Sequence, residues 1–451
     1  MKLMKTLGLL VIFAALAAYV YFYEIKGGEE REKIKELEEQ LFNFEPDSVE
    51  SIKISSFSNT FYFERKDGTW IILKPVETGA DNSNIDGLLN TLKNLKKDRE
   101  LKIKKEDLRS YGLSGKPLQV NLFFNNDGMD SIRFGINTPV GSNTYVNKID
   151  TVVYTVPQNT RNSVSKSLFD WRDKSVAKVK QNEINEFKLK NKNGKFHFLK
   201  EGSDWMLKSP IETNADNSSV NSILSKMEYG RVKEVVSESL DKPRVYRLDK
   251  PDYEIDLYLG EGKAHKRIIF SSLEKNRANG KDDSRPHIFT VDSTFIKDIN
   301  KTLFQLRDKK FAQFEQNSAD KVVVTQGDSL ITFVKDTSGT WMHNDSLKLK
   351  EWKMNSFLSS LNNLQVKKFL QENISKPTKY GLATPGRIIE IFRGEEKIQQ
   401  VSFGNKKENF VIAFSPFSQI VAEIDESAFN NLEVKTDEFV EEVKTEELDN
   451  S

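Results

Sequence analysis

Two aspartates at matching places in the chain are the residues best suited to do chemistry. Asp81 and Asp216 both stand in the sequence Ala-Asp-Asn-Ser, 135 residues apart (216 − 81). A pair of carboxylates is what many glycoside hydrolases use to cleave a sugar linkage. The alternative is that each carboxylate accepts a hydrogen bond from the first turn of the helix that follows it. A third occurrence of the pattern has Lys350 at this place, which favours the helix cap.

Other combinations of reactive residues are sparse. The histidines never pair at a spacing that would make an H-E-x-x-H metal site, and no serine lies in a G-x-S-x-G elbow. The four histidines are His197, His265, His287 and His343. Gly260-Glu261-Gly262-Lys263 lacks the spacing of a phosphate-binding loop and is interpreted as a hairpin turn, and Asp282-Asp283 is a weak indication of calcium. We predict no catalytic, cofactor-binding or metal-ligating residue.

These residues belong to a long internal repeat. Trp70, Trp205 and Trp341 begin three similar stretches, 135 (205 − 70) and 136 (341 − 205) residues apart. Each Trp is followed by apolar residues at helical spacing. In each copy this stripe begins 26 residues before a tyrosine that starts Y-G-L or Y-R-L (111 − 85, 246 − 220, 380 − 354). We interpret the tryptophans as core residues beneath the helix. We interpret the glycine of Y-G-L as the left-handed cap at the end of the short helix that precedes it.

The repeat predicts three homologous lobes, because its period is that of a whole domain rather than of a solenoid unit. We expect lobe 1 at residues 42–172, lobe 2 at 173–307 and lobe 3 at 308–432. Short β-rich runs between turn signals predict α+β lobes of antiparallel strands with packed helices. In lobe 1 the strands are expected at residues 49–54, 60–65, 70–73, 118–124, 131–136, 144–148 and 152–156, with a closing helix at 158–170.

Three further expectations concern smaller segments. Phe134-Gly135 and Phe403-Gly404 are interpreted as strand ends. Residues 274–285 are polar and are predicted to form a mobile loop. Residues 433–451 are acidic with few apolar side chains, and we expect a disordered tail there.

The N-terminus predicts a membrane anchor at residues 1–23. Residues 6–23 carry no charge and would span about 27 Å as a helix, close to a bilayer core of about 30 Å. Lys2 and Lys5 precede this span and aromatic residues end it, which places the N-terminus in the cytoplasm and the rest outside the cytoplasmic membrane. A cleaved signal peptide is the alternative, since Ala15-Leu16-Ala17 fits a cleavage site. Residues 24–41 predict a helical stalk.

Composition excludes several classes of function. The chain has a net charge of +1, so it has no concentrated basic surface for nucleic acid. It has no cysteine, which removes disulfides, thiolate catalysis and cysteine-based zinc sites.

These features together resemble an uncharacterised bacterial family, domain of unknown function 4340 (DUF4340). The resemblance is carried by the segment AYVYFYEIKGGEEREK, by W-x-x-x-x-P followed by ADNS in the first two copies, and by the Y-G-L step. The third copy departs, with neither Pro nor ADNS after Trp341. The resemblance implies an anchored envelope protein of unestablished activity, encoded beside ABC-type transport components like those of gliding-motility systems. It transfers no catalytic residue.

Three functions are compatible with the sequence. The first is a non-enzymatic interaction subunit of an ABC-type transport or gliding-motility system, with a transporter permease or an envelope protein as partner. The second is a binding module for a polysaccharide, peptide or lipid. The third is a hydrolase that uses Asp81 and Asp216. We expect no cofactor.

Overall fold

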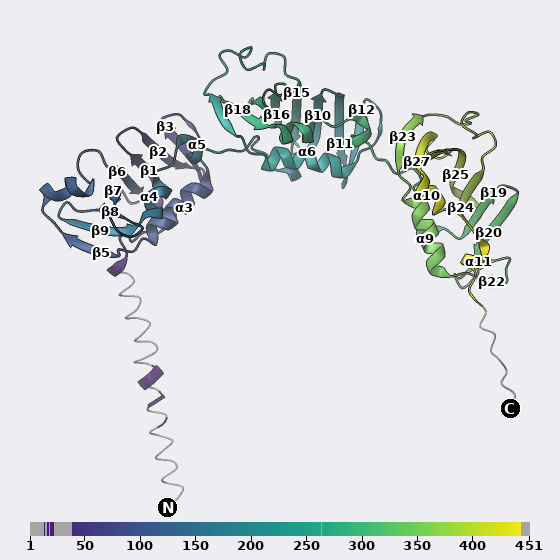
Figure 1. The fold of residues 1–451 in the computed structure, drawn as a ribbon, viewed down its shortest axis with the longest axis horizontal. Helices are drawn as coiled ribbons and strands as arrows, with labels where there is room; N and C mark the ends of the chain where they lie inside the picture. The colour runs from purple at the N-terminus through teal and green to yellow at the C-terminus, as the bar shows by residue number, and fades with distance from the viewer. Residues whose placement is uncertain (1–12, 14–15, 18, 22–37, 263, 443–451) are drawn as a thin grey trace, which may run out of the picture. The chain divides into compact units, whose positions relative to one another are not determined.

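The computed structural model describes residues 13, 16–17, 19–21, 38–262 and 264–442 (Figure 1). Most of the expected anchor, most of the expected stalk and residues 443–451 of the expected tail lie outside the described residues. In the part of the chain that is described, no helix is long and apolar enough to cross a membrane.

The described chain forms three nine-stranded antiparallel sheets with packed helices, which is the α+β class expected. The first sheet has the order β4-β3-β2-β1-β6-β7-β8-β9-β5. Its strands are β1 (Val49–Ser55), β2 (Thr60–Lys66), β3 (Thr69–Lys74), β4 (Thr78–Gly79), β5 (Arg99–Lys102), β6 (Leu118–Phe124), β7 (Met129–Asn137), β8 (Asn143–Asn147) and β9 (Val152–Pro157).

The second and third sheets repeat this order, β13-β12-β11-β10-β15-β16-β17-β18-β14 and β22-β21-β20-β19-β24-β25-β26-β27-β23. The second comprises β10 (Ile184–Asn191), β11 (Gly194–Glu201), β12 (Asp204–Ser209), β13 (Thr213–Asn214), β14 (Glu234–Ser237), β15 (Tyr253–Leu259), β16 (Ala264–Phe270), β17 (Arg277–Asp282) and β18 (Ile288–Asp292). The third comprises β19 (Lys321–Gln326), β20 (Ser329–Lys335), β21 (Trp341–His343), β22 (Leu347–Lys348), β23 (Val366–Gln371), β24 (Arg387–Arg393), β25 (Glu396–Lys407), β26 (Phe410–Ser415) and β27 (Ile420–Asp425).

Each sheet carries one long helix, as the apolar stripes predict. The long helices are α3 (Asn82–Lys93), α6 (Asn217–Tyr229) and α9 (Glu351–Asn362); Figure 1 shows α6 running along the second sheet. Their stripe residues are buried, and the first stripe consists of Ile85, Leu88, Leu89 and Leu92. The shorter helices are η2 (Pro46–Ser48), η3 (Lys105–Tyr111), α4 (Gln158–Val164), α5 (Leu168–Trp171), η4 (Gln181–Glu183), α7 (Ser293–Ile299), α8 (Leu303–Leu306), η5 (Gln316–Ser318), α10 (Glu426–Asn430) and α11 (Thr436–Phe439).

The density of backbone contacts divides the chain into two compact units. One holds the first sheet together with residues 229–238 and 287–291, and the other holds the remainder of the second sheet and the whole third sheet. The lobe boundaries at residues 172, 307 and 432 stay a prediction. The word lobe is used below for those three residue ranges.

Three details differ from the sequence-based expectations. The segment expected to be a mobile loop contains strand β17, in which Ala278 is 1% and Asp282 0% exposed. The single closing helix expected in lobe 1 is two helices, α4 and α5, because Ser167 caps a new helix by accepting a hydrogen bond from the backbone N–H of Asp170. The tail expected to be disordered begins with an ordered segment that contains α11 and the buried Phe439.

The ordered start of the tail is the third copy of a segment that closes each sheet. Backbone bridges join Ala80 to Arg172, Ala215 to Arg307 and Leu349 to Val440. In each copy the residue after the first bridged residue also donates its backbone N–H to the closing segment. Asp81 donates to the Trp171 carbonyl at 2.8 Å, Asp216 to the Leu306 carbonyl at 2.9 Å and Lys350 to the Phe439 carbonyl at 2.7 Å. Residues 436–442 therefore pack against the third sheet and are not a tail, although they lie beyond residue 432, the expected end of lobe 3.

The first two closing segments also carry a buried arginine. Arg172 donates from Nη2 to both carboxylate oxygens of Glu238 at 3.1 Å, and Arg307 donates from Nη1 to Glu372 at 2.6 Å. The two arginine side chains are 1% and 5% exposed. Desolvated guanidinium groups need such a partner, because an unpaired buried charge is strongly destabilising.

The two glutamates occupy equivalent places in the repeat. Glu238 follows Arg231, which bridges to Ser175, by seven residues (238 − 231), and Glu372 follows Gln365, which bridges to Lys310, by the same number (372 − 365). In lobe 1 the equivalent bridged residue is Lys96, and the residue seven places after it is Ile103 (103 − 96). In the third closing segment Val440 stands at the place of the two arginines. The arginine–glutamate pair therefore occurs where one copy of the repeat follows another. Its two halves are replaced by apolar residues at the first and last copies.

We predict that Arg307→Val lowers the free energy of unfolding by about 2–3 kcal/mol, because Glu372 loses its partner while remaining two-thirds buried. The double variant Arg307→Val/Glu372→Ile, which places the residues of the chain ends at this joint, is expected to recover most of the loss. Urea unfolding followed by circular dichroism measures both.

Arg393→Val is the matched control for this prediction. Arg393 pairs with Glu396 on the surface, where both side chains are more than half exposed, so its loss is expected to cost less than about 0.5 kcal/mol. Equal effects of Arg307→Val and Arg393→Val would contradict the assigned role of the buried pair.

Candidate functional site

The three tryptophans of the repeat are core residues, as predicted. Trp70, Trp205 and Trp341 are each 3% exposed. The backbone N–H groups of Trp70 and Trp205 donate to Asn82 and Asn217, the first residues of the following helices, at 2.8 and 2.9 Å. Trp70 and Trp205 thus join strand to helix, and all three tryptophans are buried.

The paired aspartates are helix caps. Asp81 accepts a hydrogen bond from the backbone N–H of Asn84 at 3.2 Å, and Asp216 accepts one from Ser219 at 2.8 Å. Asp216 also forms an ion pair of 2.6 Å with Lys309. Burial alone would raise the pKa of Asp216, but the bonds from Lys309 and Ser219 outweigh it, so the pKa lies below its ordinary value. Lys350 stands at the matching place before α9 and makes no side-chain cap.

The remaining polar groups named from the sequence are engaged in local structure. His197 contacts Glu186 at 2.9 Å, His265 contacts Asp256 at 2.8 Å, and His343 contacts the Thr332 carbonyl at 2.9 Å. The buried carboxylate of Asp282 accepts hydrogen bonds from Ser284 and Arg285. Over the described ranges, no three His, Cys, Asp or Glu side chains are grouped so that they could hold a metal ion.

The glycine of the Y-G-L step is a left-handed cap, with φ of 68° at Gly112 and 76° at Gly381. In lobe 2 Arg247 adopts φ of 56° without a glycine. Phe134-Gly135 is not a strand end, because it lies inside β7 at a break in the β7–β8 register. A Cβ on Gly135 would lie 2.0 Å from the carbonyl oxygen of Tyr111, so the glycine lets the strand approach the turn.

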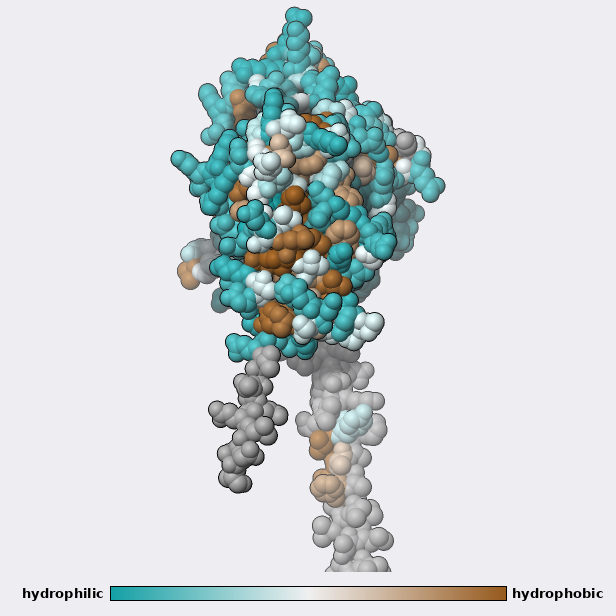
Figure 2. Space-filling view, turned by 90° about the vertical axis from the view of Figure 1, so that its right-hand side faces the viewer, coloured by the Kyte–Doolittle hydropathy of each residue, from teal (hydrophilic) through white to brown (hydrophobic). Residues whose placement is uncertain are grey.

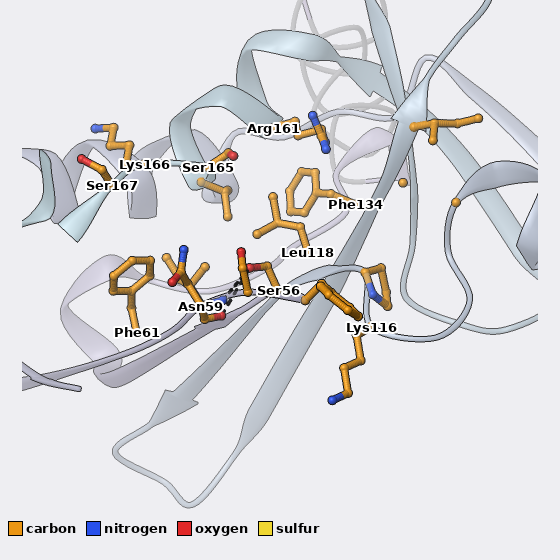
Figure 3. A pocket seen from close by; sticks show the side chains of 18 residues that line it. Ser56, Asn59, Phe61, Lys116, Leu118, Phe134, Arg161, Ser165, Lys166 and Ser167 are labelled. Carbon is orange, nitrogen blue, oxygen red and sulfur yellow. Dashed lines mark hydrogen bonds between the residues drawn. The ribbon is translucent and has the colours of Figure 1, made fainter. Parts of the chain in front are cut away.

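A cavity in lobe 1 lies between the β1–β2 turn and the connector from α4 to α5. Its volume is about 550 Å³. Apolar side chains, among them Phe61, Leu118 and Phe134, form part of the wall (Figure 3). Ser56 and Asn59 point from the turn toward the space, and Ser56 is held by a 3.3 Å hydrogen bond to the carbonyl of Asn59.

The cavity has a positive balance of charge. Lys116, Arg161 and Lys166 line it, and no carboxylate occurs among the described residues that do so. Lys166 donates to Asn84 at 2.6 Å, and burial lowers the pKa of its ammonium group. Lys116 extends away from the space (Figure 3). The Arg161 guanidinium makes no ion pair with any described residue, and its Nε is buried without a hydrogen-bond partner.

Sequence reasoning missed this cavity, because its residues are ordinary serines and a lone arginine. The repeat itself contains a signal that could have found it. Arg161 is the fourth residue of α4, and the fourth residues of α7 and α10 are Ile296 and Phe429. A charged residue at a position that is apolar in the other two copies marks a place where lobe 1 departs from the shared core.

The family model described as Domain of unknown function (DUF4340) matches residues 70–251 and again residues 205–385. The chain belongs to this family. The two matches to the DUF4340 model begin at Trp70 and Trp205, so they follow the internal period of 135 residues (205 − 70). The family carries no assigned activity in its description.

Other comparisons add little to the DUF4340 match. No curated protein matches the chain. Among solved structures, the DNA polymerase sliding clamp from Pseudomonas aeruginosa with ligand is 8% identical with a TM-score of 0.15, covering 85% of this chain and 93% of that one. The DNA polymerase III subunit beta from Pseudomonas aeruginosa is 10% identical with a TM-score of 0.13, covering 84% and 92%. These scores support no inference about fold or function.

We predict that Asp216→Ala lowers the free energy of unfolding by about 1–2 kcal/mol near pH 7, because a helix cap is lost. Asp216→Asn keeps a capping side chain and removes only the charge. Because the folded-state pKa is below the unfolded value of about 3.9, the charge stabilises the fold fully above about pH 4, and this contribution disappears as pH falls through the folded-state pKa. Urea unfolding between pH 7 and pH 3 measures the difference.

The difference between Asp216→Asn and the original chain is therefore expected to shrink on acidification. A difference that stays constant from pH 7 to pH 3 would contradict the ion pair with Lys309.

Proposed function

We propose that this protein is a membrane-anchored, extracytoplasmic interaction subunit, accessory to an ABC-type transport or gliding-motility system. The observation that carries the proposal is Trp352, the second residue of α9, which is 66% exposed. The second residues of α3 and α6 are Ser83 and Ser218. Lobe 3 thus replaces a small polar residue with a large aromatic one that its own fold does not bury.

An exposed tryptophan is typical of a protein-binding surface. Tryptophan is enriched among the few residues that dominate binding energy at interfaces. Trp352 borders a hollow of about 410 Å³ that is also lined by Phe357, Phe439 and several polar side chains. Figure 2 shows some apolar residues gathered on the face turned toward the viewer, which is otherwise largely hydrophilic.

The proposed partner is the membrane permease of a transporter or an envelope protein next to it. The family resemblance supports the transporter association, and the uncharged N-terminal segment supports a location on the outer side of the cytoplasmic membrane. The residues shared by the three copies are core residues and caps, which supports a binding role rather than catalysis.

A second function, an envelope ligand-binding module, is favoured by the cavity of lobe 1. Its volume lies within the range of about 300–1,000 Å³ found for small-molecule sites, and both apolar and polar side chains line it. The two functions are compatible, because Trp352 and the cavity belong to different lobes.

We predict that gentle solubilisation and cross-linking in cells recover the protein with a transporter permease or envelope protein. Trp352→Ser, which restores the residue of the other two copies, is expected to reduce that recovery at least about tenfold, because loss of a buried interface Trp costs 2 kcal/mol or more. Quantitative mass spectrometry of the purified complex measures recovery.

Met129→Ser is the matched control, since Met129 is 63% exposed in lobe 1 and is expected to leave recovery unchanged. Recovery of the original chain without any partner, or equal recovery of both variants, would contradict the proposed surface.

A further inference from the structure

We propose that the cavity of lobe 1 binds the carboxylate or phosphate group of a small acidic molecule, with Arg161 as the residue that holds the anion. The rest of the ligand would lie against the apolar wall formed by Leu118 and Phe134. This inference rests on the second proposed function and is independent of the interaction surface on lobe 3.

The side chains that line the cavity favour a ligand that carries a carboxylate or phosphate group. A guanidinium group offers several N–H donors in a planar arrangement that fits carboxylate and phosphate oxygens. Arg161 has no carboxylate partner in the described chain, and its Nε is buried without a hydrogen-bond acceptor. The Nε of Arg387 lacks an acceptor too, but its Nη1 donates to the Phe429 carbonyl, whereas the Arg161 side chain has no such bond to a described residue. A buried donor without a partner is costly, so a ligand that supplies an acceptor gains this energy back on binding.

Lobe 2 shows what the same place looks like when it is closed. Asn191 occupies the place of Ser56, because each follows by two residues a strand residue of matching register, Leu189 in β10 and Ile54 in β1. Asn191 donates from Nδ2 to the carbonyls of Ile299 and Lys301 at 3.0 and 2.9 Å. Asn193 also donates to the carbonyl of Asn300 at 3.1 Å. These bonds fasten the hairpin turn to the connector between α7 and α8.

Apolar packing completes the closure in lobe 2. Ile296 occupies the place of Arg161 and is 1% exposed, and Tyr253 occupies the place of Leu118 and is 2% exposed. The corresponding turn residue in lobe 1 is Ser56, whose hydroxyl bonds within its own turn instead. A serine side chain is too short to bridge to the connector as an asparagine does.

Lobe 3 fills the same place differently. Arg387, which begins β24 as Leu118 begins β6, donates from Nη1 to the Phe429 carbonyl at 2.9 Å. Its guanidinium carbon lies 4.1 Å from the centre of the Phe429 ring, and Phe429 occupies the place of Arg161. Arg387 is 6% exposed. In lobe 3 the Arg387 guanidinium therefore contacts both the carbonyl and the ring of Phe429, and so links strand β24 to helix α10.

The comparison makes the lobe 1 cavity a local departure from a shared design. Lobe 2 closes this place with side-chain hydrogen bonds and apolar packing, and lobe 3 closes it with the contacts of Arg387 to Phe429, although the Nε of Arg387 lacks an acceptor there. The first copy leaves a space, and no described residue accepts a hydrogen bond from the Arg161 side chain. A turn that is not tied to the connector also keeps the space open toward solvent, so a small molecule can enter.

The test uses the full-length chain in a mild detergent and isothermal titration calorimetry with three probes. Glucuronic acid carries a carboxylate, glucose 6-phosphate carries a phosphate, and glucose is the neutral match. We expect at least one acid to bind at least about tenfold more tightly than glucose, since a hydrogen bond to a charged group is worth about a tenfold to hundredfold change in affinity. The acid that binds distinguishes carboxylate from phosphate recognition.

Variants drawn from lobe 2 keep the test sharp, because the repeat already accommodates them. Arg161→Ile is expected to reduce the affinity for the acid to that for glucose, and Ser56→Asn is expected to weaken all probes by closing the space. Arg109→Ile makes the same substitution at an exposed residue outside the lining and is expected to change nothing. Circular dichroism checks that each variant folds.

Two results would overturn the inference, and they differ in reach. Equal binding of glucose and both acids, unaffected by Arg161→Ile but weakened by Ser56→Asn, would leave the ligand-binding function standing and remove the oxyanion. Absence of binding by all three probes at millimolar concentration would remove both the oxyanion and the ligand-binding function. Neither result bears on co-purification through Trp352.

Discussion

The backbone closure of each sheet by its own last residues is the constraint on which the rest of the fold depends. In lobe 1 the bridge between Ala80 and Arg172 fixes the residue before the N-cap of α3 and the residue that follows α5. Three residues later Ser175 bridges to Arg231. The connector is thus hydrogen-bonded on both sides within a single compact unit. Because these hydrogen bonds fix the backbone of the connector, the side chain of Arg172 is held where it can pair with Glu238.

Much of this arrangement could be predicted from the sequence. The strands of lobe 1 follow from runs of β-branched and aromatic residues between turns, and the helix follows from the stripe that begins at Ile85. The capping role of Asp81 follows from its place before that stripe. These features depend on local pattern, and each copy of the repeat supports the others.

The features that escaped prediction depend on distant contacts. Strand β17 contains a lysine, an aspartate and a glycine, and it is a strand because β16 supplies its hydrogen-bond partner and Asp282 finds partners in Ser284 and Arg285. Residues 436–442 are acidic, yet Phe439 packs into the third core. The cavity could not be predicted because it arises where Ser56 fails to reach a connector about a hundred residues away, and no local pattern reports that distance.

The copies of the repeat have kept their frame and diverged at their surfaces. Two of the places that differ are the fourth residue of a short helix, where Arg161 stands, and the second residue of a long helix, where Trp352 stands. Neither change alters a strand, a stripe or a closing bridge. The two sites proposed above therefore fit on a common scaffold without a change in its frame.

The local closure of each sheet also bears on how such a chain avoids misassembly. Three sheets with the same strand order in one polypeptide invite the exchange of equivalent strands, a characteristic failure of repeat proteins. Here every strand of the first sheet and its closing helix lie between residues 49 and 171. A ribosome synthesises that whole segment before it makes the corresponding strands of the second sheet. The first sheet can thus begin to close before a full competing copy exists, because all of its partners precede those of the second sheet in the chain.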